Sequence, residues 1–123
     1  MISAAVAADL SAMEAQRINQ VRDALKHALL PLEIVLHGVD AGFSVIEPRT
    51  DPFDGSVTLY CLWQDQHGQL LGSVQLHDSG RVFAEYDVVK NHPLKSGWFI
   101  ESVSVWGDDS QLRHELQLLK LPG

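Results

Sequence analysis

The sequence predicts an α+β domain: an N-terminal helix packed on one face of a five- or six-stranded, mainly antiparallel meander sheet. Three observations predict this class. An apolar stripe recurs at helical spacing near the start of the chain, several later runs alternate apolar and polar residues, and glycine-containing turns separate those runs. We expect the helix over about residues 4–30 and the sheet over about 32–121, within a single domain of residues 1–123.

The predicted helix is marked by its cap, its apolar stripe and its end. Ser11 and Glu14 have the spacing of a capping box, so the regular part of the helix should begin near Ser11. Pro31 disfavours helical geometry at the preceding residue, which should end the helix. The stripe consists of Leu10, Met13, Ile18, Val21, Leu25, Ala28 and Leu29. It needs an apolar partner, and either the sheet or a second helix in a dimer would provide one.

The central meander is predicted by three alternating runs, at residues 57–64, 69–77 and 81–89. Loops at residues 65–68 and 78–80 join them, and Gly80 suits the positive φ that a three-residue loop requires. Both loops place the same apolar residues on one face, and Gly72 should leave room for Tyr86. The predicted cross-strand pairs are Trp63–Leu70, Cys61–Gly72, Leu59–Val74 and Val57–Leu76, then Leu76–Val82, Val74–Ala84, Gly72–Tyr86 and Leu70–Val88. A one-residue slip would break this agreement.

The remaining segments are predicted with less regular patterns. Short strands are expected at residues 32–37 and 43–47, loops at 48–55 and 90–97, and a long strand at 98–106. The pattern of residues 98–106 leaves open which of its faces is buried. Residues 111–121 fit either a helix or a strand, and we favour a final strand that completes the meander.

Composition and charge limit the class of partner. The 123 residues are 46% hydrophobic and 20% charged, which is typical of a soluble globular protein. The net charge of −7 argues against binding to nucleic acid or to an anionic membrane. We therefore expect a protein partner or a homodimer, with no nucleic acid and no membrane.

The single cysteine, Cys61, excludes an intramolecular disulfide and a cysteine-rich metal site. The first residues lack a positive charge, and Asp9 interrupts their apolar run, so we expect no signal peptide. Together these features predict a cytoplasmic protein.

No motif in the chain assigns a chemical reaction. The six histidines have no metal-ligand spacing, and no nucleophile motif or glycine-rich phosphate loop is present in the sequence. We expect no cofactor and assign no catalytic or metal-binding residue.

The second face of the predicted sheet is polar but carries apolar residues, which indicates an interaction surface. The residues predicted to bind a ligand or partner are Tyr60, Phe83, Glu85, Asp87, Trp98 and Trp106. A non-enzymatic protein-binding module, acting through this open face or by oligomerisation, is the favoured function. The alternatives are a small-molecule binder with an aromatic-lined pocket between helix and sheet, and an acid–base enzyme that uses Glu85, Asp87 or Glu101 with His77 or His92.

Overall fold

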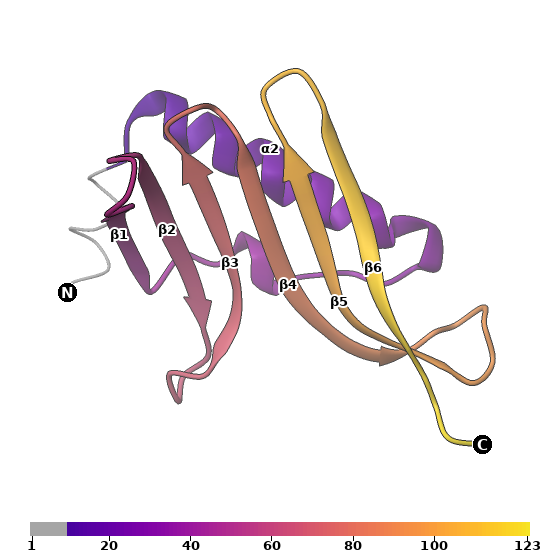
Figure 1. Ribbon diagram of the computed structural model, residues 1–123. Coiled ribbons are helices and arrows are strands. Elements are labelled where there is room, and N and C mark those ends of the chain that lie inside the picture. Colours follow the sequence, from indigo (N-terminus) through magenta and orange to yellow (C-terminus); the bar gives the residue numbers. More distant parts are fainter. Residues whose placement is uncertain (1–9) are drawn as a thin grey trace.

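The computed structural model describes residues 10–123, in which one α-helix lies across one face of a six-stranded sheet (Figure 1). Each strand pairs antiparallel with the next, so the sheet is a meander in the order β1 to β6. The elements are α2 (Ala12–Leu29), the 3₁₀ turns η1 (Leu30–Leu32) and η2 (Gly38–Asp40), and the strands β1 (Val45–Thr50), β2 (Val57–Gln64), β3 (Leu70–His77), β4 (Val82–Asn91), β5 (Trp98–Gly107) and β6 (Leu112–Lys120). The predicted α+β class is confirmed, including the final strand.

Helix α2 begins where the capping box predicts. The Ser11 hydroxyl accepts the Glu14 N–H at 3.0 Å, and the Glu14 carboxylate accepts the Ser11 N–H at 2.9 Å. The part of the predicted helix at residues 4–9 lies outside the described residues. Met13, which we expected on the buried stripe, is 64% exposed because five residues, or about 140° of helix, separate it from buried Ile18. Beyond Leu29 the chain continues as η1, with Pro31 in its first turn.

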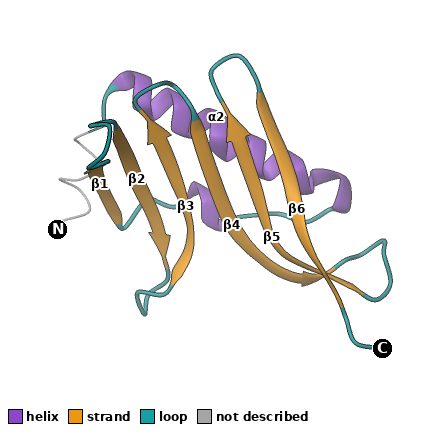
Figure 2. Cartoon of the chain, in the orientation of Figure 1, coloured by secondary structure: helices purple, strands orange, loops and turns teal. Residues whose placement is uncertain are grey.

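The prediction of a strand at residues 32–37 is wrong. Glu33 has a left-handed backbone (φ 58°), and the chain then runs under the sheet to η2 as an irregular connection, which Figure 2 shows without strands. Leu32, Ile34 and Leu36 alternate because they pack against the core between helix and sheet, not because they pair with a strand. An alternating pattern shows that one side of a segment is buried, but it does not show whether the backbone of that segment pairs with a strand.

Strand β1 begins and ends later than the strand predicted at residues 43–47. It includes Pro48, which we placed in a loop, and the loop shortens to residues 51–56. Proline is tolerated there because β1 is an edge strand with only β2 beside it.

The predicted register between β3 and β4 is confirmed for Leu76–Val82, Val74–Ala84 and Gly72–Tyr86. The predicted register between β2 and β3 is wrong by two residues, since Cys61 pairs with Val74 rather than with Gly72. The Asp65 N–H donates to the Gln69 carbonyl at 2.9 Å, so this loop is one residue shorter than predicted. A bulge that leaves Leu71 without a partner in β2 accounts for the second residue of the register shift.

A shift of two residues leaves every side chain on its predicted face. Val74 and Ala84 are fully buried and Leu59 is half-buried against the core, whereas Glu85 is exposed on the opposite face. The exception is Leu70, which we expected inside and which is 51% exposed. The bulge beside it brings Leu71 against the core instead.

A second irregularity settles which face of β5 is buried. Glu101 has no partner in β6, and this extra residue turns Ile100 to the same side as Val103 and Val105, which are all fully buried. Across from it, Val88 and Val89 interrupt the pairing of β4 with β5. Two bulges therefore produce one continuous apolar face from a pattern that looks mixed in sequence.

Val89 has a left-handed backbone within this irregularity (φ 53°), which a β-branched residue rarely adopts. Because this conformation costs an L-residue roughly 1–2 kcal/mol and asparagine tolerates it better, Val89→Asn should raise the free energy of unfolding by about 1 kcal/mol. Its side chain is exposed, so little packing is lost. Urea titration should show the gain, whereas Val57→Asn, at an exposed β2 valine with ordinary φ, should lose stability. Equal losses at both positions would contradict strain at Val89.

The core lies between the sheet and the layer formed by α2 and the connection after it. The helix contacts strands β3 to β6, and its buried residues are Ile18, Val21, Leu25, Ala28 and Leu29. Within residues 10–123, none of the helices combines the length and the apolarity needed to cross a bilayer.

Candidate functional site

The face of the sheet opposite α2 is not covered by any element within residues 10–123, and it points to the viewer in Figure 1. We call it the open face. Because neighbouring strands are antiparallel and in register, their outward side chains line up in rows across the sheet. The chemistry of the face is best described row by row.

The first row carries two arginines and a histidine. Arg49 pairs with Thr58, Thr58 pairs with His77, and the His77 N–H donates to the Arg81 carbonyl at 2.9 Å. We call Arg49, His77 and Arg81, with Thr58 between them, the basic row. It is unexpected in a chain with a net charge of −7.

The next row carries aromatic side chains. Tyr60 pairs with Gln75, Gln75 with Phe83, and Phe83 with Trp106, so the aromatic row runs from β2 to β5. Three of the six residues predicted to bind a partner, Tyr60, Phe83 and Trp106, thus share one line. Phe83 and Trp106 are direct neighbours and are 38% and 37% exposed.

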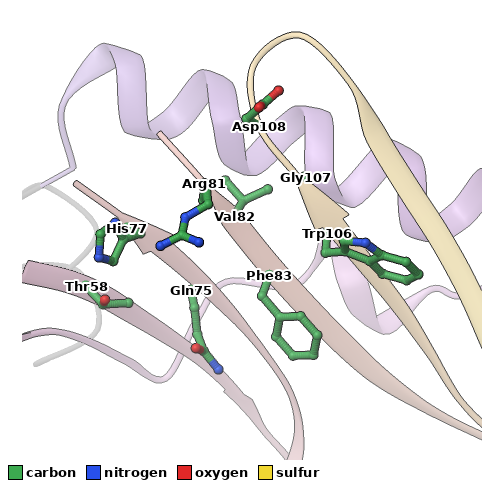
Figure 3. A pocket seen from close by; sticks show the side chains of 9 residues that line it. All are labelled: Thr58, Gln75, His77, Arg81, Val82, Phe83, Trp106, Gly107 and Asp108. Carbon is green, nitrogen blue, oxygen red and sulfur yellow. The ribbon is translucent and has the colours of Figure 1, made fainter. Parts of the chain in front are cut away.

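A groove of about 400 Å³ lies where the two rows meet (Figure 3). The rings of Phe83 and Trp106 stand side by side at one end of it, and Arg81 and His77 lie at the other. Its lining is mostly apolar and consists of Thr58, Gln75, His77, Arg81, Val82, Phe83, Trp106, Gly107 and Asp108. The groove offers an apolar wall beside a cationic group, which suits a side chain of another protein.

Arg81 and Arg49 differ in whether a carboxylate of the same chain lies close to the guanidinium. The Arg49 guanidinium lies 4.0 Å from the centre of the Tyr60 ring, and its Nε is 3.7 Å from the Glu47 carboxylate. Arg81 contacts the Ser79 hydroxyl at 3.4 Å, and no carboxylate in the described part of the chain lies within ion-pair distance of it. Arg81 is therefore available to a bound anionic group, as is the exposed Arg113, which pairs with Trp106 at the β6 end of the aromatic row.

The predicted carboxylates lie on the other side of the aromatic row. Glu85 pairs with Ser73 and Ser104, Asp87 pairs with Ser102, and both acids are exposed. Partial burial, reinforced by the charge of Glu101, raises the pKa of Asp87 above its usual range. Glu101 thus lies near Asp87, as one of the predicted registers required. Glu85, like Arg81, has no oppositely charged group within ion-pair distance among residues 10–123.

Trp98 is the predicted site residue that the structure does not bring to the others. It pairs with Lys120 at the far end of β5, eight residues before Trp106. Eight residues of strand span roughly 26 Å, so the two tryptophans cannot share one small site.

Sequence reasoning did not assign the basic row to the site, although part of its signal was available. The predicted 78–80 loop already placed His77 opposite Arg81 on the open face. Arg49 could not be found in this way, because residues 48–55 were read as a loop and the structure places Arg49 in β1.

The residues of the predicted acid–base enzyme do not come together. His77 lies two rows from Glu85, and its Nδ1 is 2.7 Å from the Ser79 hydroxyl. His92 lies in the loop after β4, where its Nδ1 accepts the N–H groups of Leu94 and Lys95. Burial raises the pKa of the Cys61 thiol to about 12, which keeps it protonated and unreactive. Within residues 10–123, no three His, Cys, Asp or Glu side chains are placed to hold a metal ion.

Comparisons with known proteins found no relative. No family model matches the chain, no curated protein matches it, and no solved structure matches it. Its function is therefore argued from the site alone.

The space between helix and sheet is filled by aromatic side chains. Trp63 is 2% exposed and lies between Phe43 and Tyr86, with ring centroids 4.8 and 5.3 Å away. Its indole N–H donates to the Ala41 carbonyl at 3.1 Å. Three hollows at the rim of this layer measure about 170, 180 and 340 Å³, and the largest of the three is lined mainly by polar and charged side chains. Small-molecule sites usually measure about 300–1,000 Å³ and are mostly apolar, so the open groove is the better candidate.

Proposed function

We propose that this protein is a non-enzymatic protein-binding module that docks its partner on the open face of the sheet. The observation that carries the proposal is the Phe83–Trp106 pair, which lies half-exposed in a groove beside the unpaired Arg81. Aromatic residues and arginine are the side chains most enriched at the centres of protein interfaces. Their arrangement here, apolar at the centre with charged rows on either side, is the usual layout of such a patch.

The aromatic pair is large enough to anchor a partner. A phenylalanine or tryptophan side chain presents about 150–250 Å², and a third of that area remains accessible at each ring. Covering it would contribute roughly 1–2 kcal/mol per ring, at about 25 cal/mol per Å². Truncating either ring should therefore weaken binding in a measurable way.

A cytoplasmic location completes the proposal. The one cysteine is fully buried and makes no disulfide, which suits a reducing compartment. Fractionation of the native cell, with detection of the untagged protein, would test this location.

The binding proposal is tested by affinity capture from the native cell extract with wild-type and variant baits. Phe83→Ala and Trp106→Ala should each lose at least one protein that the wild type retains, the chain's own untagged copies included. Leu94→Ala is the matched control, because Leu94 is a large, exposed apolar residue in the β4–β5 loop, away from the open face. Circular dichroism should first show that each bait is folded. Identical sets of captured proteins on all four baits would refute docking at this groove.

A further inference from the structure

We propose that the partner for the open face is a second copy of this chain, packed sheet against sheet about a two-fold axis that lies between the two sheets, perpendicular to the strands, and passes over Phe83 of β4. This inference rests on the proposed function and names its partner. In such a dimer the β4 strands of the two copies cross in opposite directions. Each contact between residue i of one copy and residue j of the other is then repeated between residue j of the first copy and residue i of the second.

The outward residues of β4 and of the loop before it are self-complementary in this arrangement. Arg81 precedes Phe83 by two residues, and Glu85 follows it by two, so the strand presents a cation, a ring and a carboxylate in order. Reversing the strand about Phe83 puts Arg81 of one copy over Glu85 of the other, twice. Both groups have no ion-pair partner among residues 10–123, so the contact pairs charges that are otherwise unpaired.

The distances of sheet packing allow this contact. Face-to-face sheets lie about 10 Å apart, which an arginine and a glutamate span together. Packed sheets usually cross at about 30°. Arg81 lies about 7 Å along the strand from Phe83, so this crossing displaces it by roughly 3 Å relative to Glu85 of the partner. That displacement is smaller than the ~4.8 Å between neighbouring strands, so the pairing survives the twist.

The open face has about the area that a stable dimer needs. Six strands of six to ten residues, at about 4.8 Å between strands and about 3.3 Å per residue, cover on the order of 800 Å². A standard interface buries about 800 Å² on each partner. A partner that covered only the groove would leave most of this face in water.

The charges of the face favour a second copy over other proteins. An acidic partner would match Arg81 and Arg113 but would be repelled by Glu85 and Asp87, and a basic partner would meet the reverse problem. A second copy in the reversed orientation brings the basic row of one chain to the acidic side of the other. The neighbouring Ser102 and Ser104 hydroxyls do not donate to Glu85 or Asp87, since both donate to the Gln117 side chain at 3.0 Å.

A charge-reversal experiment tests the pairing. The wild-type protein should sediment at twice the 13.6 kDa of the chain at micromolar to millimolar concentrations. Arg81→Glu and Glu85→Arg should each raise the dimer dissociation constant by on the order of 100-fold, because each places like charges together at two symmetric contacts. The double variant Arg81→Glu/Glu85→Arg restores both contacts and should recover most of the affinity. Recovery by the double variant is the result that a loss of folding could not produce.

Matched controls change the same charges elsewhere. Lys95→Glu in the β4–β5 loop and Asp23→Arg on the exposed side of α2 should leave the dissociation constant within about threefold of wild type. A monomeric wild-type protein at all concentrations would overturn the inference, and so would a dimer that none of the β4 variants weakens. A monomer whose capture of another protein still depends on Phe83 and Trp106 would refute self-association while leaving the proposed function standing.

Discussion

Replacing Trp63 with alanine should lower the free energy of unfolding by about 3–5 kcal/mol, the largest loss we expect from one side chain. Trp63 is the largest fully buried side chain, and it fills the space between Phe43 and Tyr86 beneath the connection to β1. Truncation would remove both ring contacts and leave a cavity that the surrounding strands cannot close. Urea unfolding followed by circular dichroism measures the loss without relying on the deleted fluorophore.

Trp63→Phe separates the ring contacts from the hydrogen bond. Phenylalanine keeps an aromatic ring in place but leaves the Ala41 carbonyl without the indole donor. We expect a loss of about 1–2 kcal/mol from the hydrogen bond and the smaller ring. If alanine and phenylalanine at this position unfolded at the same urea concentration, the aromatic packing would not be the source of stability.

Gly72→Ala should lower the free energy of unfolding by about 3 kcal/mol, the second largest effect. An added Cβ at Gly72 would lie 2.4 Å from the Glu85 carbonyl oxygen and 2.8 Å from the Tyr86 ring. The carbonyl belongs to the paired strand β4, so relief would require β3 and β4 to separate rather than one side chain to rotate. Thermal unfolding and urea titration should both report the loss.

The neighbouring residue provides the control for this clash. Ser73 is half-buried on the open face, and Ser73→Ala adds no atom, so its free energy of unfolding should stay within about 0.5 kcal/mol of wild type. A Gly72→Ala variant as stable as Ser73→Ala would show that β3 and β4 are less closely paired than the structure describes. Since the clash is with the backbone of Glu85, Gly72→Ala should also weaken the proposed self-association.

The two sides of the sheet were predictable because of the period of two. A strand exposes alternate residues to opposite faces, so the apolar set of residues 74, 76, 82, 84, 86 and 88 could be assigned without knowing any distance. The register of β2 was wrong by two residues and yet left every face correct except at the bulge beside Leu70 and Leu71, because only an odd shift exchanges the faces. The capping box at Ser11 was equally readable, since its hydrogen bonds span only three residues.

The candidate site was predictable only in part. Tyr60, Phe83 and Trp106 were assigned to it from alternation and aromatic character, and the register unites them in one row. Trp98 was assigned with them from the same alternation, but the bulge at Glu101 exchanges the faces of the residues before it, so Trp98 lies on the side of buried Ile100 and far from Trp106. Arg49 was missed because proline-rich composition concealed the edge strand β1.

By itself, the sequence determined the fold class, the capped helix and the two faces of the central strands, because each depends on contacts that repeat over two to four residues. Tertiary structure alone decided the bulges at Leu71 and Glu101, the path of residues 32–37 and the alignment of Phe83 with Trp106 beside the groove. These features depend on how distant strands match in length and twist, and local periodicity carries no record of that match. The groove on the open face belongs to this second group.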